Sequence, residues 1–288
     1  MSEGNPSKPY MPQNPFGVEQ RYWERLQRMR LLDDALMTAA LDNNIKATQL
    51  ILRIILEKED LIITGVKTQP EYKNLYGRSI WLDVEAADSS GVKYDIEIQR
   101  DERGANPERA RYHSAMMDAK SLKSRQNFSE LPTTYVLFIT ETDYWEEGLS
   151  LYHFDRTMRE TGRDFGDRAH IIYANGAYRG EDSIGLLMAD FRESNPGEMH
   201  YPELAERVNA LKNSEDEVKK MCQAMEITYQ EGHTDGLRDG TLKTSVRSLK
   251  SLMKKMGLSV EEAMDTLEIP EDDRQACVEY MTSQSDAE

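Results

Sequence analysis

The segment from Leu82 to Gln99 alternates apolar and polar residues with a period of two, which predicts a β-hairpin. The even-numbered positions outside the turn are apolar, and most of the odd-numbered ones are polar, many of them acidic. Successive side chains of a strand point to opposite faces, so we expect one buried face and one exposed face. Ser89-Ser90-Gly91 predicts a three-residue loop in which Gly91 adopts a left-handed conformation.

The register of this hairpin would bring two carboxylates together. If the loop closes between Asp88 and Val92, Asp83 lies directly opposite Glu97, with both side chains on one face. Opposed carboxylates repel each other unless a cation lies between them. The acidic residues of this face meet one lysine, Lys93, so the face is not balanced in charge. A site for a hard divalent cation fits this arrangement. An acidic face that is simply solvated is the alternative.

The rest of the first two hundred residues alternates between helix and strand patterns. Before the hairpin, helices are predicted over residues 19–41 and 44–58, the second of them apolar on most sides. After it, Asn106 caps a helix that has Pro107 in its first turn. Further strands are predicted over residues 61–64, 135–140, 149–154 and 170–173. This order predicts an α/β fold with a mixed sheet flanked by helices.

The C-terminal region changes character, because it is rich in charged helix patterns and has no strand pattern. A long amphipathic helix is predicted over residues 215–231. Gly232, Gly236 and Gly240 follow, and each weakens a helix by about 1 kcal/mol relative to alanine. They either let two helices approach closely or form a flexible joint, and we favour the joint. Two helices follow on either side of Gly257, as in a helix-turn-helix DNA-binding motif or, more simply, a helical appendage.

These patterns predict a disordered segment over residues 1–18, a globular domain over 19–200 and a helical region over 201–288. The two cysteines, Cys222 and Cys277, form neither a disulfide framework nor a zinc-binding pattern, and we expect reduced thiols. No apolar run is long enough to span a bilayer, and the N-terminus lacks a signal-peptide core. The sequence therefore predicts a cytoplasmic protein that does not bind a membrane.

Several segments of the chain form an ordered set: Asp33-Asp34-Ala35-Leu36-Met37, Trp81-Leu82-Asp83-Val84, Tyr94-Asp95-Ile96-Glu97-Ile98-Gln99-Arg100, Arg109-Ala110-Arg111-Tyr112-His113-Ser114-Ala115 and the strand from Leu131 to Thr140. Together they resemble the recombination-promoting nuclease and transposase family. This family is a bacterial branch of the PD-(D/E)XK nuclease superfamily, in which Glu-x-Gln replaces Glu-x-Lys. The resemblance covers roughly residues 30–235, and the family often has an aromatic residue where Ala35 stands. The resemblance implies a restriction-endonuclease-like core with a helical C-terminal extension.

The resemblance also implies a phosphodiesterase site with Mg²⁺ or Mn²⁺ as cofactor. Asp83 and Glu97 are the expected metal ligands, with the backbone carbonyl of Ile98 as a third. Gln99 would orient the attacking water, but glutamine cannot supply the positive charge of the usual lysine. Asp34 would be the acidic residue of the first helix, by resemblance alone, and a solvent-facing helix aspartate is the alternative.

Because Gln99 is neutral, a cation from elsewhere would have to serve, and the next helix offers Arg111, Lys120 and Lys123. With Arg100, these residues are the predicted DNA-binding set. The alternative is an ordinary helix surface, and the net charge of −16 opposes tight nonspecific binding to DNA. The remaining candidates near the site are given minor roles. We expect Asp95 and Glu85 to support the ligands or to be solvated, and His113 to be a surface or packing residue.

Two functions from different classes remain open. The first is a metal-dependent DNA endonuclease associated with recombination or mobile elements, for which a homodimer would suit a double-strand break. The second is a catalytically weak or inactive nuclease fold that acts as a binding or regulatory module. The acidic net charge and the missing lysine favour the second, whereas the opposed carboxylates favour the first. A helical interaction protein built on the C-terminal third is a further alternative.

Overall fold

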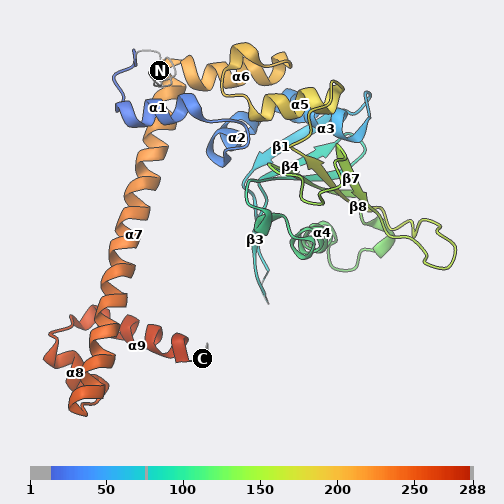
Figure 1. The fold of residues 1–288 in the computed structure, drawn as a ribbon. Helices are drawn as coiled ribbons and strands as arrows, with labels where there is room; N and C mark the ends of the chain where they lie inside the picture. The colour runs from blue at the N-terminus through green and yellow to red at the C-terminus, as the bar shows by residue number, and fades with distance from the viewer. Residues whose placement is uncertain (1–13, 75–76, 286–288) are drawn as a thin grey trace, which may run out of the picture. The chain divides into compact units, whose positions relative to one another are not determined.

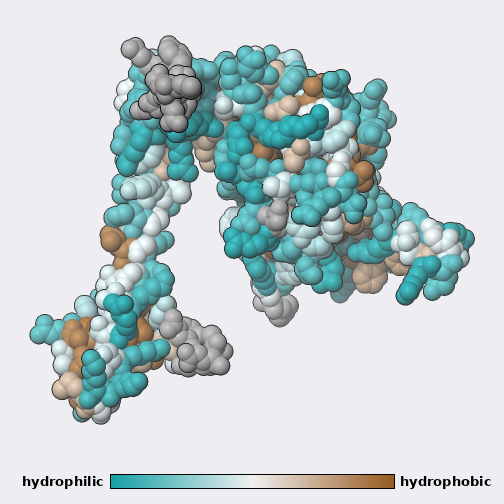
Figure 2. Space-filling model, in the orientation of Figure 1, coloured by the Kyte–Doolittle hydropathy of each residue, from teal (hydrophilic) through white to brown (hydrophobic). Residues whose placement is uncertain are grey.

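The computed structural model describes residues 14–74 and 77–285, and the chain forms two compact units, Met1–Met221 and Cys222–Glu288. Most of the segment predicted to be disordered, residues 1–18, lies outside the described residues. Among the described residues, no helix is long and apolar enough to cross a membrane. The surface in Figure 2 is largely hydrophilic, in keeping with that finding.

The first unit is built from helices and strands in alternation (Figure 1). Its helices are α1 (Gln20–Arg28), α2 (Asp34–Leu41), α3 (Ile45–Leu56), α4 (Pro107–Ser121), α5 (Ser183–Arg192) and α6 (Pro202–Asn213), with short 3-10 turns η1 (Glu102–Ala105), η2 (Phe128–Glu130) and η3 (Pro196–Glu198). Its strands are β1 (Ile63–Thr68), β2 (Glu71–Tyr72), β3 (Ile80–Trp81), β4 (Val84–Asp88), β5 (Lys93–Gln99), β6 (Thr134–Thr140), β7 (Leu151–Phe154) and β8 (Ala169–Asn175).

Six of these strands form one mixed sheet in the order β1-β4-β5-β6-β8-β7. The pairs β1/β4, β4/β5 and β7/β8 are antiparallel, whereas β5/β6 and β6/β8 are parallel. Parallel neighbours need a crossover connection, and α4 provides it between β5 and β6. The predicted class, a mixed sheet flanked by helices, is confirmed.

The hairpin of β4 and β5 has the predicted register and loop. Val84 pairs with Ile96, and Glu85 pairs with Asp95, so the continuation of this register sets Asp83 against Glu97. The loop closes through the N–H of Asp88, which donates to the carbonyl of Val92 at 3.1 Å, and Gly91 has a φ of 84°. Gly91 therefore takes the left-handed conformation that the loop requires.

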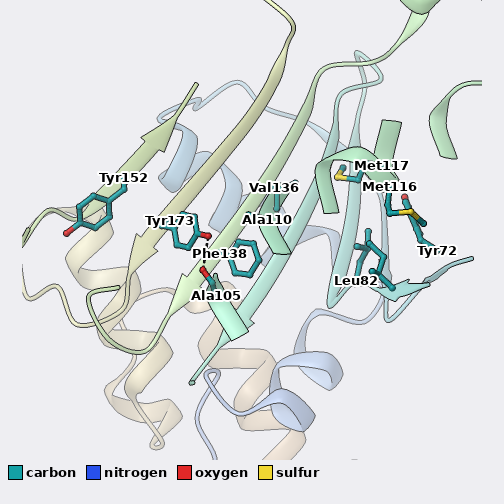
Figure 3. Close-up of a cluster of buried hydrophobic side chains, with 11 residues drawn as sticks. Tyr72, Leu82, Ala105, Ala110, Met116, Met117, Val136, Phe138, Tyr152 and Tyr173 are labelled. Carbon is teal, nitrogen blue, oxygen red and sulfur yellow. Dashed lines mark hydrogen bonds between the residues drawn. The ribbon is translucent and has the colours of Figure 1, made fainter. Parts of the chain in front are cut away.

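The expectation of one exposed face is wrong for β5, since its residues from Tyr94 to Ile98 are all buried. The physical reason is α4, which packs against β6 and β8 and covers the face on which Asp95 and Glu97 lie. A cluster of buried residues fills the space between this helix and the sheet (Figure 3). It includes Ala110 and Met117 of α4 with Val136 and Phe138 of β6. The acidic stripe is thus enclosed in the protein.

The single helix predicted over residues 19–41 is also wrong, because the structure divides it into α1 and α2. The break is a turn that the sequence stabilises locally. The backbone N–H of Arg30 donates to the Asp33 carboxylate at 2.7 Å, and the N–H of Asp33 donates to the carbonyl of Arg30 at 2.8 Å. Met29, which ends α1, is in an extended conformation. This turn carries Asp33 and Asp34 to the start of α2.

A buried lysine fixes α1 against α6. The Lys212 ammonium donates to the carbonyls of Gln27 and Met29 at 3.1 and 2.6 Å and to the carbonyl of Ser194. In return, the Gln27 amide donates to the Lys212 carbonyl at 2.9 Å. Buried polar groups that are fully hydrogen-bonded hold one geometry, so the orientation of α1 on the first unit is well defined.

The C-terminal unit is helical, with α8 (Val260–Thr266) and α9 (Glu271–Ser285) following the long helix α7 (Glu215–Met256). The joint predicted at Gly232, Gly236 and Gly240 is wrong, because α7 runs through them without a break. The cost of three glycines, about 3 kcal/mol relative to alanine, is spread over a helix of 42 residues. Ser259 caps α8 in a capping box with Glu262, as predicted. Both cysteines are free and buried.

Candidate functional site

Asp83 and Glu97 meet where β4 begins beside β5, and the backbone locks them in place. The N–H of Asp83 donates to Oε1 of Glu97 at 2.9 Å. The N–H of Ile98 donates to Oδ2 of Asp83, also at 2.9 Å. Each carboxylate is therefore held by the strand that carries the other, which positions both before any ligand arrives. The structure brings together the two residues predicted to face each other.

Asp95 and His113 belong to the same buried cluster, so the solvated alternative for Asp95 and the surface alternative for His113 are wrong. Asp95 is fully buried, and His113 is only 2% exposed. The Nδ1 atom of His113 lies 2.8 Å from Oδ2 of Asp95 and 3.6 Å from Oε1 of Glu97. His113 reaches this position because it lies on the inner face of α4, one turn after Arg109. Asp95 is thus neither solvated nor peripheral.

Arg109 brings a cation into contact with this cluster. Its Nη2 atom donates to Oε2 of Glu97 at 2.5 Å, and its Nε donates to Nε2 of His113 at 3.3 Å. Its Nη1 atom donates to the carbonyl of Gly104 at 3.1 Å. The first turn of α4 is fixed by Asn106, whose side chain accepts from the N–H of Arg109 at 2.8 Å. The capping residue therefore also positions the guanidinium.

Gln99 lies at the end of the acidic stripe of β5 and packs against Gly104 of η1. A Cβ atom at residue 104 would collide with Oε1 of Gln99 and lie 3.6 Å from Nη1 of Arg109. Gly104 therefore allows the close approach of the Gln99 amide. The Gln99 carbonyl accepts from the N–H of Glu141 at 3.0 Å, which fixes the backbone at this point.

The buried carboxyl groups resist ionisation. Burial raises the pKa of Asp95 to about 8, and the negative charge of Asp83 adds to the increase, whereas Arg109 opposes it. Burial also raises the pKa of Glu97 well above its usual range, with further increases from Asp95 and Asp83. Desolvation raises the pKa of Asp83 in the same way, and the nearby charge of Asp34 adds to it. The metal-free site therefore favours a protonated Asp95 carboxyl group near neutral pH.

Stability of the metal-free protein should then fall as the pH rises from about 6.5 to about 8, the raised pKa of Asp95. In this window the folded state binds more protons than the unfolded state, whose carboxyl groups are ionised, so the free energy of unfolding decreases by about 1.4 kcal/mol per pH unit for each proton released. Burial lowers the pKa of His113, which acts in the opposite direction but mainly below pH 6.5.

Thermal unfolding in EDTA across this pH range measures the effect. Each kcal/mol corresponds to a shift of about 2–4 °C in the midpoint for a domain of this size. Asp95→Asn should flatten the dependence, because the amide has no proton to release. A midpoint that rises with pH in the native chain would contradict the raised pKa values.

The donor set fits a divalent cation. Asp95, Glu97 and His113 each offer one ligand atom, and these atoms lie within 4.8 Å of one another. Among the described residues, Oδ1 of Asp95 is a buried acceptor with no hydrogen-bond partner, which a cation would satisfy. Carboxylate oxygens suit Mg²⁺ or Mn²⁺. The His113 imidazole already contacts Asp95, so we interpret it as a partner of that carboxylate.

Asp34 and Glu85 lie at the margins of the site. Asp34 is exposed at the start of α2, and its negative charge contributes to the raised pKa of Asp83. Glu85 is partly buried on the neighbouring strand and accepts a hydrogen bond from the Tyr72 hydroxyl at 2.6 Å. Asp34 is thus close enough to Asp83 to act on it electrostatically, whereas Glu85 is engaged with Tyr72.

The four predicted DNA-binding residues do not gather at the cluster. Arg100 pairs with Asp33 at 2.6 Å and with Glu141 at 2.8 Å. Lys120 donates to the carbonyl of Glu71 at 3.0 Å, with its ammonium 4.2 Å from the centre of the Tyr72 ring. Arg111 and Lys123 are exposed.

The sequence therefore predicted the helix that brings a cation to the cluster, but it did not predict that the residue is Arg109. A helical pattern could have found it, because Ala110, Ser114 and Met117 mark the buried face of α4. His113 lies on that face, and Arg109 precedes it by one turn.

One comparison with known proteins finds a similarity to a family. Residues 40–175 match the model of the PD-(D/E)XK nuclease family transposases. The match contains Asp83, Asp95, Glu97, Gln99, Arg109 and His113, but not Asp34. No curated protein and no solved structure matches the chain significantly.

Proposed function

We propose that the protein is a divalent-metal-dependent DNA endonuclease, on the premise that residues 40–175 match the model of the PD-(D/E)XK nuclease family transposases. The observation that carries the proposal is the pair of hydrogen bonds that fixes Asp83 and Glu97 against each other in a buried site. Placing carboxylates side by side away from water is costly unless a cation compensates them. The family is nuclease-like and associated with mobile elements, and its nucleases generally use divalent metals.

In this proposal, Asp83 and Glu97 hold Mg²⁺ or Mn²⁺, with Asp95 and the carbonyl of Ile98 as further oxygen donors. The bound metal would lower the pKa of a water molecule and offset the negative charge of the phosphate. Gln99, on the same strand face two residues after Glu97, would orient that water through neutral hydrogen bonds. Asp34, at the edge of the site, would bind solvent around the metal.

Arg109 takes the part that a lysine plays elsewhere in the superfamily. Its guanidinium lies against Glu97, so it is already close to the place where a phosphate would meet the acids. A charge-assisted hydrogen bond from arginine to a phosphate oxygen stabilises the developing charge of the transition state more than a neutral amide can. His113 would keep Arg109 and Asp95 in position through its two ring nitrogens.

One observation favours the alternative, a binding or regulatory module with little activity. Arg109 already neutralises Glu97, and an ion pair of this kind can replace a metal in a scaffold that no longer cleaves DNA. The unpartnered Oδ1 atom of Asp95 favours the nuclease, because Arg109 does not satisfy it.

We also propose that the protein acts in the cytoplasm and that cutting both strands requires a homodimer.

The test is nicking of supercoiled plasmid DNA by the native chain and by Asp83→Asn, in EDTA, Mg²⁺ and Mn²⁺. Nicking that requires the metal and is lost in Asp83→Asn, with an unchanged circular dichroism spectrum, is the expected result. Nicking that persists in EDTA or in Asp83→Asn would contradict the proposal of a metal-dependent endonuclease. No nicking in any metal would favour the binding module.

A further inference from the structure

A second feature of the first unit is a hollow lined mainly by arginines. Its lining consists of Arg21, Arg25, Arg28, Met29, Asp33 and Arg100. We call its four arginines the α1 arginine face, since Arg21, Arg25 and Arg28 come from α1. Four guanidinium groups and one carboxylate line this hollow in a chain whose net charge is −16. Glu19, Glu24 and Glu141 also pair with three of these arginines, so the feature that calls for an explanation is the clustering of the arginines.

The arginines of α1 share one side of the helix because they are spaced four and three residues apart. The opposite side is apolar, and Tyr22, Trp23 and Leu26 are buried. The hydrogen bonds between Gln27 and Lys212 hold this helix on the first unit. The three guanidinium groups are thus presented outward from a backbone that is already fixed, which lowers the entropy cost of binding.

The charges of Arg25 and Arg28 can be reached by a ligand. Arg25 is exposed, and among the described residues no carboxylate lies within ion-pairing distance of it. Arg21 pairs with Glu19 at 2.8 Å and Arg28 pairs with Glu24 at 3.1 Å, but both pairs are solvent-exposed. Exposed pairs of this kind contribute little, about 0–1 kcal/mol, so a phosphate can replace the glutamates.

The hollow adjoins the candidate active site through two residues. Arg100 directly follows Gln99, and Asp33 directly precedes Asp34. Arg100 and Asp33 contact each other at 2.6 Å, which joins the end of β5 to the turn between α1 and α2. A polyanion bound along α1 would therefore continue towards the acids of β5.

The spacing of the arginines suits a nucleic-acid backbone. At a rise of about 1.5 Å per residue, the seven steps from Arg21 to Arg28 cover about 10 Å of helix axis. A DNA strand presents one phosphate per about 3.4 Å of its axis, so this length corresponds to about three phosphates. We propose that the α1 arginine face binds the phosphate backbone of duplex DNA and leads it to the active site. This inference rests on the proposed nuclease function and adds the surface that binds its substrate.

The experiment compares DNA binding by the native full-length chain and by the double variant Arg25→Gln/Arg28→Gln. Fluorescence anisotropy of a labelled 30-base-pair duplex is measured in EDTA between 50 and 200 mM NaCl, where metal-dependent cleavage cannot occur. The matched control is Arg159→Gln/Arg163→Gln, which removes two exposed arginines from the loop between β7 and β8. A second variant, Arg25→Lys/Arg28→Lys, keeps the charges.

The native chain should bind with a steep salt dependence. The glutamine variant should lose about one unit of the slope of log Kd against log salt for each arginine removed, and about 10- to 100-fold in affinity at the lowest salt. The lysine variant should keep most of the slope. In plasmid nicking, the glutamine variant should show a higher KM with kcat little changed, because α1 does not contact the reacting phosphate.

Three results would overturn the proposal. If the slope of log Kd against log salt is unchanged in the glutamine variant, the α1 arginine face does not bind DNA. The nuclease proposal would still hold, provided that the native chain nicks plasmid DNA. An equal loss in the control variant would show that only the net charge matters. A native chain that neither binds nor cuts the duplex would end both proposals, and binding to an acidic protein would then be the use of this face.

Discussion

Replacing Glu97 by glutamine is expected to reduce metal-dependent nicking by at least about 10³-fold, the equivalent of roughly 4 kcal/mol of transition-state stabilisation. Glu97 is the residue on which the site converges, because it contacts Asp83, His113 and Arg109. The amide keeps the size of the side chain and can still accept from the N–H of Asp83. It removes the charge that would bind the cation, so the loss should appear as lost activity at every metal concentration.

Glu85→Gln is the matched control for this variant. The same chemical change is then made on the neighbouring strand of the same hairpin, where Glu85 pairs with Asp95 in register and accepts from Tyr72. We expect it to keep nicking within a few-fold of the native rate. Equal losses in the two variants, or a Glu97→Gln protein as active as the native chain, would show that Glu97 has no special role.

The second large effect is expected at Arg109. Arg109→Met should lower kcat for nicking by about 100-fold or more, since one charge-assisted hydrogen bond to a developing negative charge is worth about 3 kcal/mol in an enclosed site. Arg109→Lys should retain part of the rate, because it keeps the charge but not the forked geometry. KM should change less than kcat, which separates this residue from the α1 arginine face.

Metal affinity gives Arg109 a distinct signature. Its guanidinium lies 2.5 Å from Glu97, where it competes with a cation for that carboxylate. Arg109→Met should therefore bind Mn²⁺ more tightly than the native chain while cutting DNA more slowly. Arg111→Met, on the exposed side of the same helix, should change neither property. A loss of metal affinity in Arg109→Met would mean that Arg109 only supports the fold of the site.

The hairpin could be predicted from sequence because its information is local. The alternation from Leu82 to Gln99 and the loop at Gly91 determine strand, register and facing partners within one segment. Asn106 and Pro107 likewise predicted the start of α4, and Ser259 with Glu262 predicted the start of α8. In each case the residues that decide the structure are neighbours in the chain.

The environment of the acids could not be predicted in this way. Polar residues at alternate positions predict an exposed face, but whether a helix covers it depends on a crossover formed by a segment further along the chain. Asp95 and Glu97 therefore appeared exposed from the pattern alone. The contact between Arg109 and Glu97 depends on the same packing. The prediction of a joint at the glycines of α7 failed for a different reason. A helix propensity that is lower than that of alanine by about 1 kcal/mol per glycine does not decide the structure of a long helix.

The most direct test of the central claim, that Asp83 and Glu97 form a divalent-metal site, is a calorimetric titration of the metal-free chain with Mn²⁺. Native protein and Glu85→Gln should show saturable binding with similar affinity. Asp83→Asn and Glu97→Gln should lose it while keeping a cooperative thermal transition. Saturable binding that persists unchanged in Glu97→Gln, or its absence from the native chain, would contradict the account.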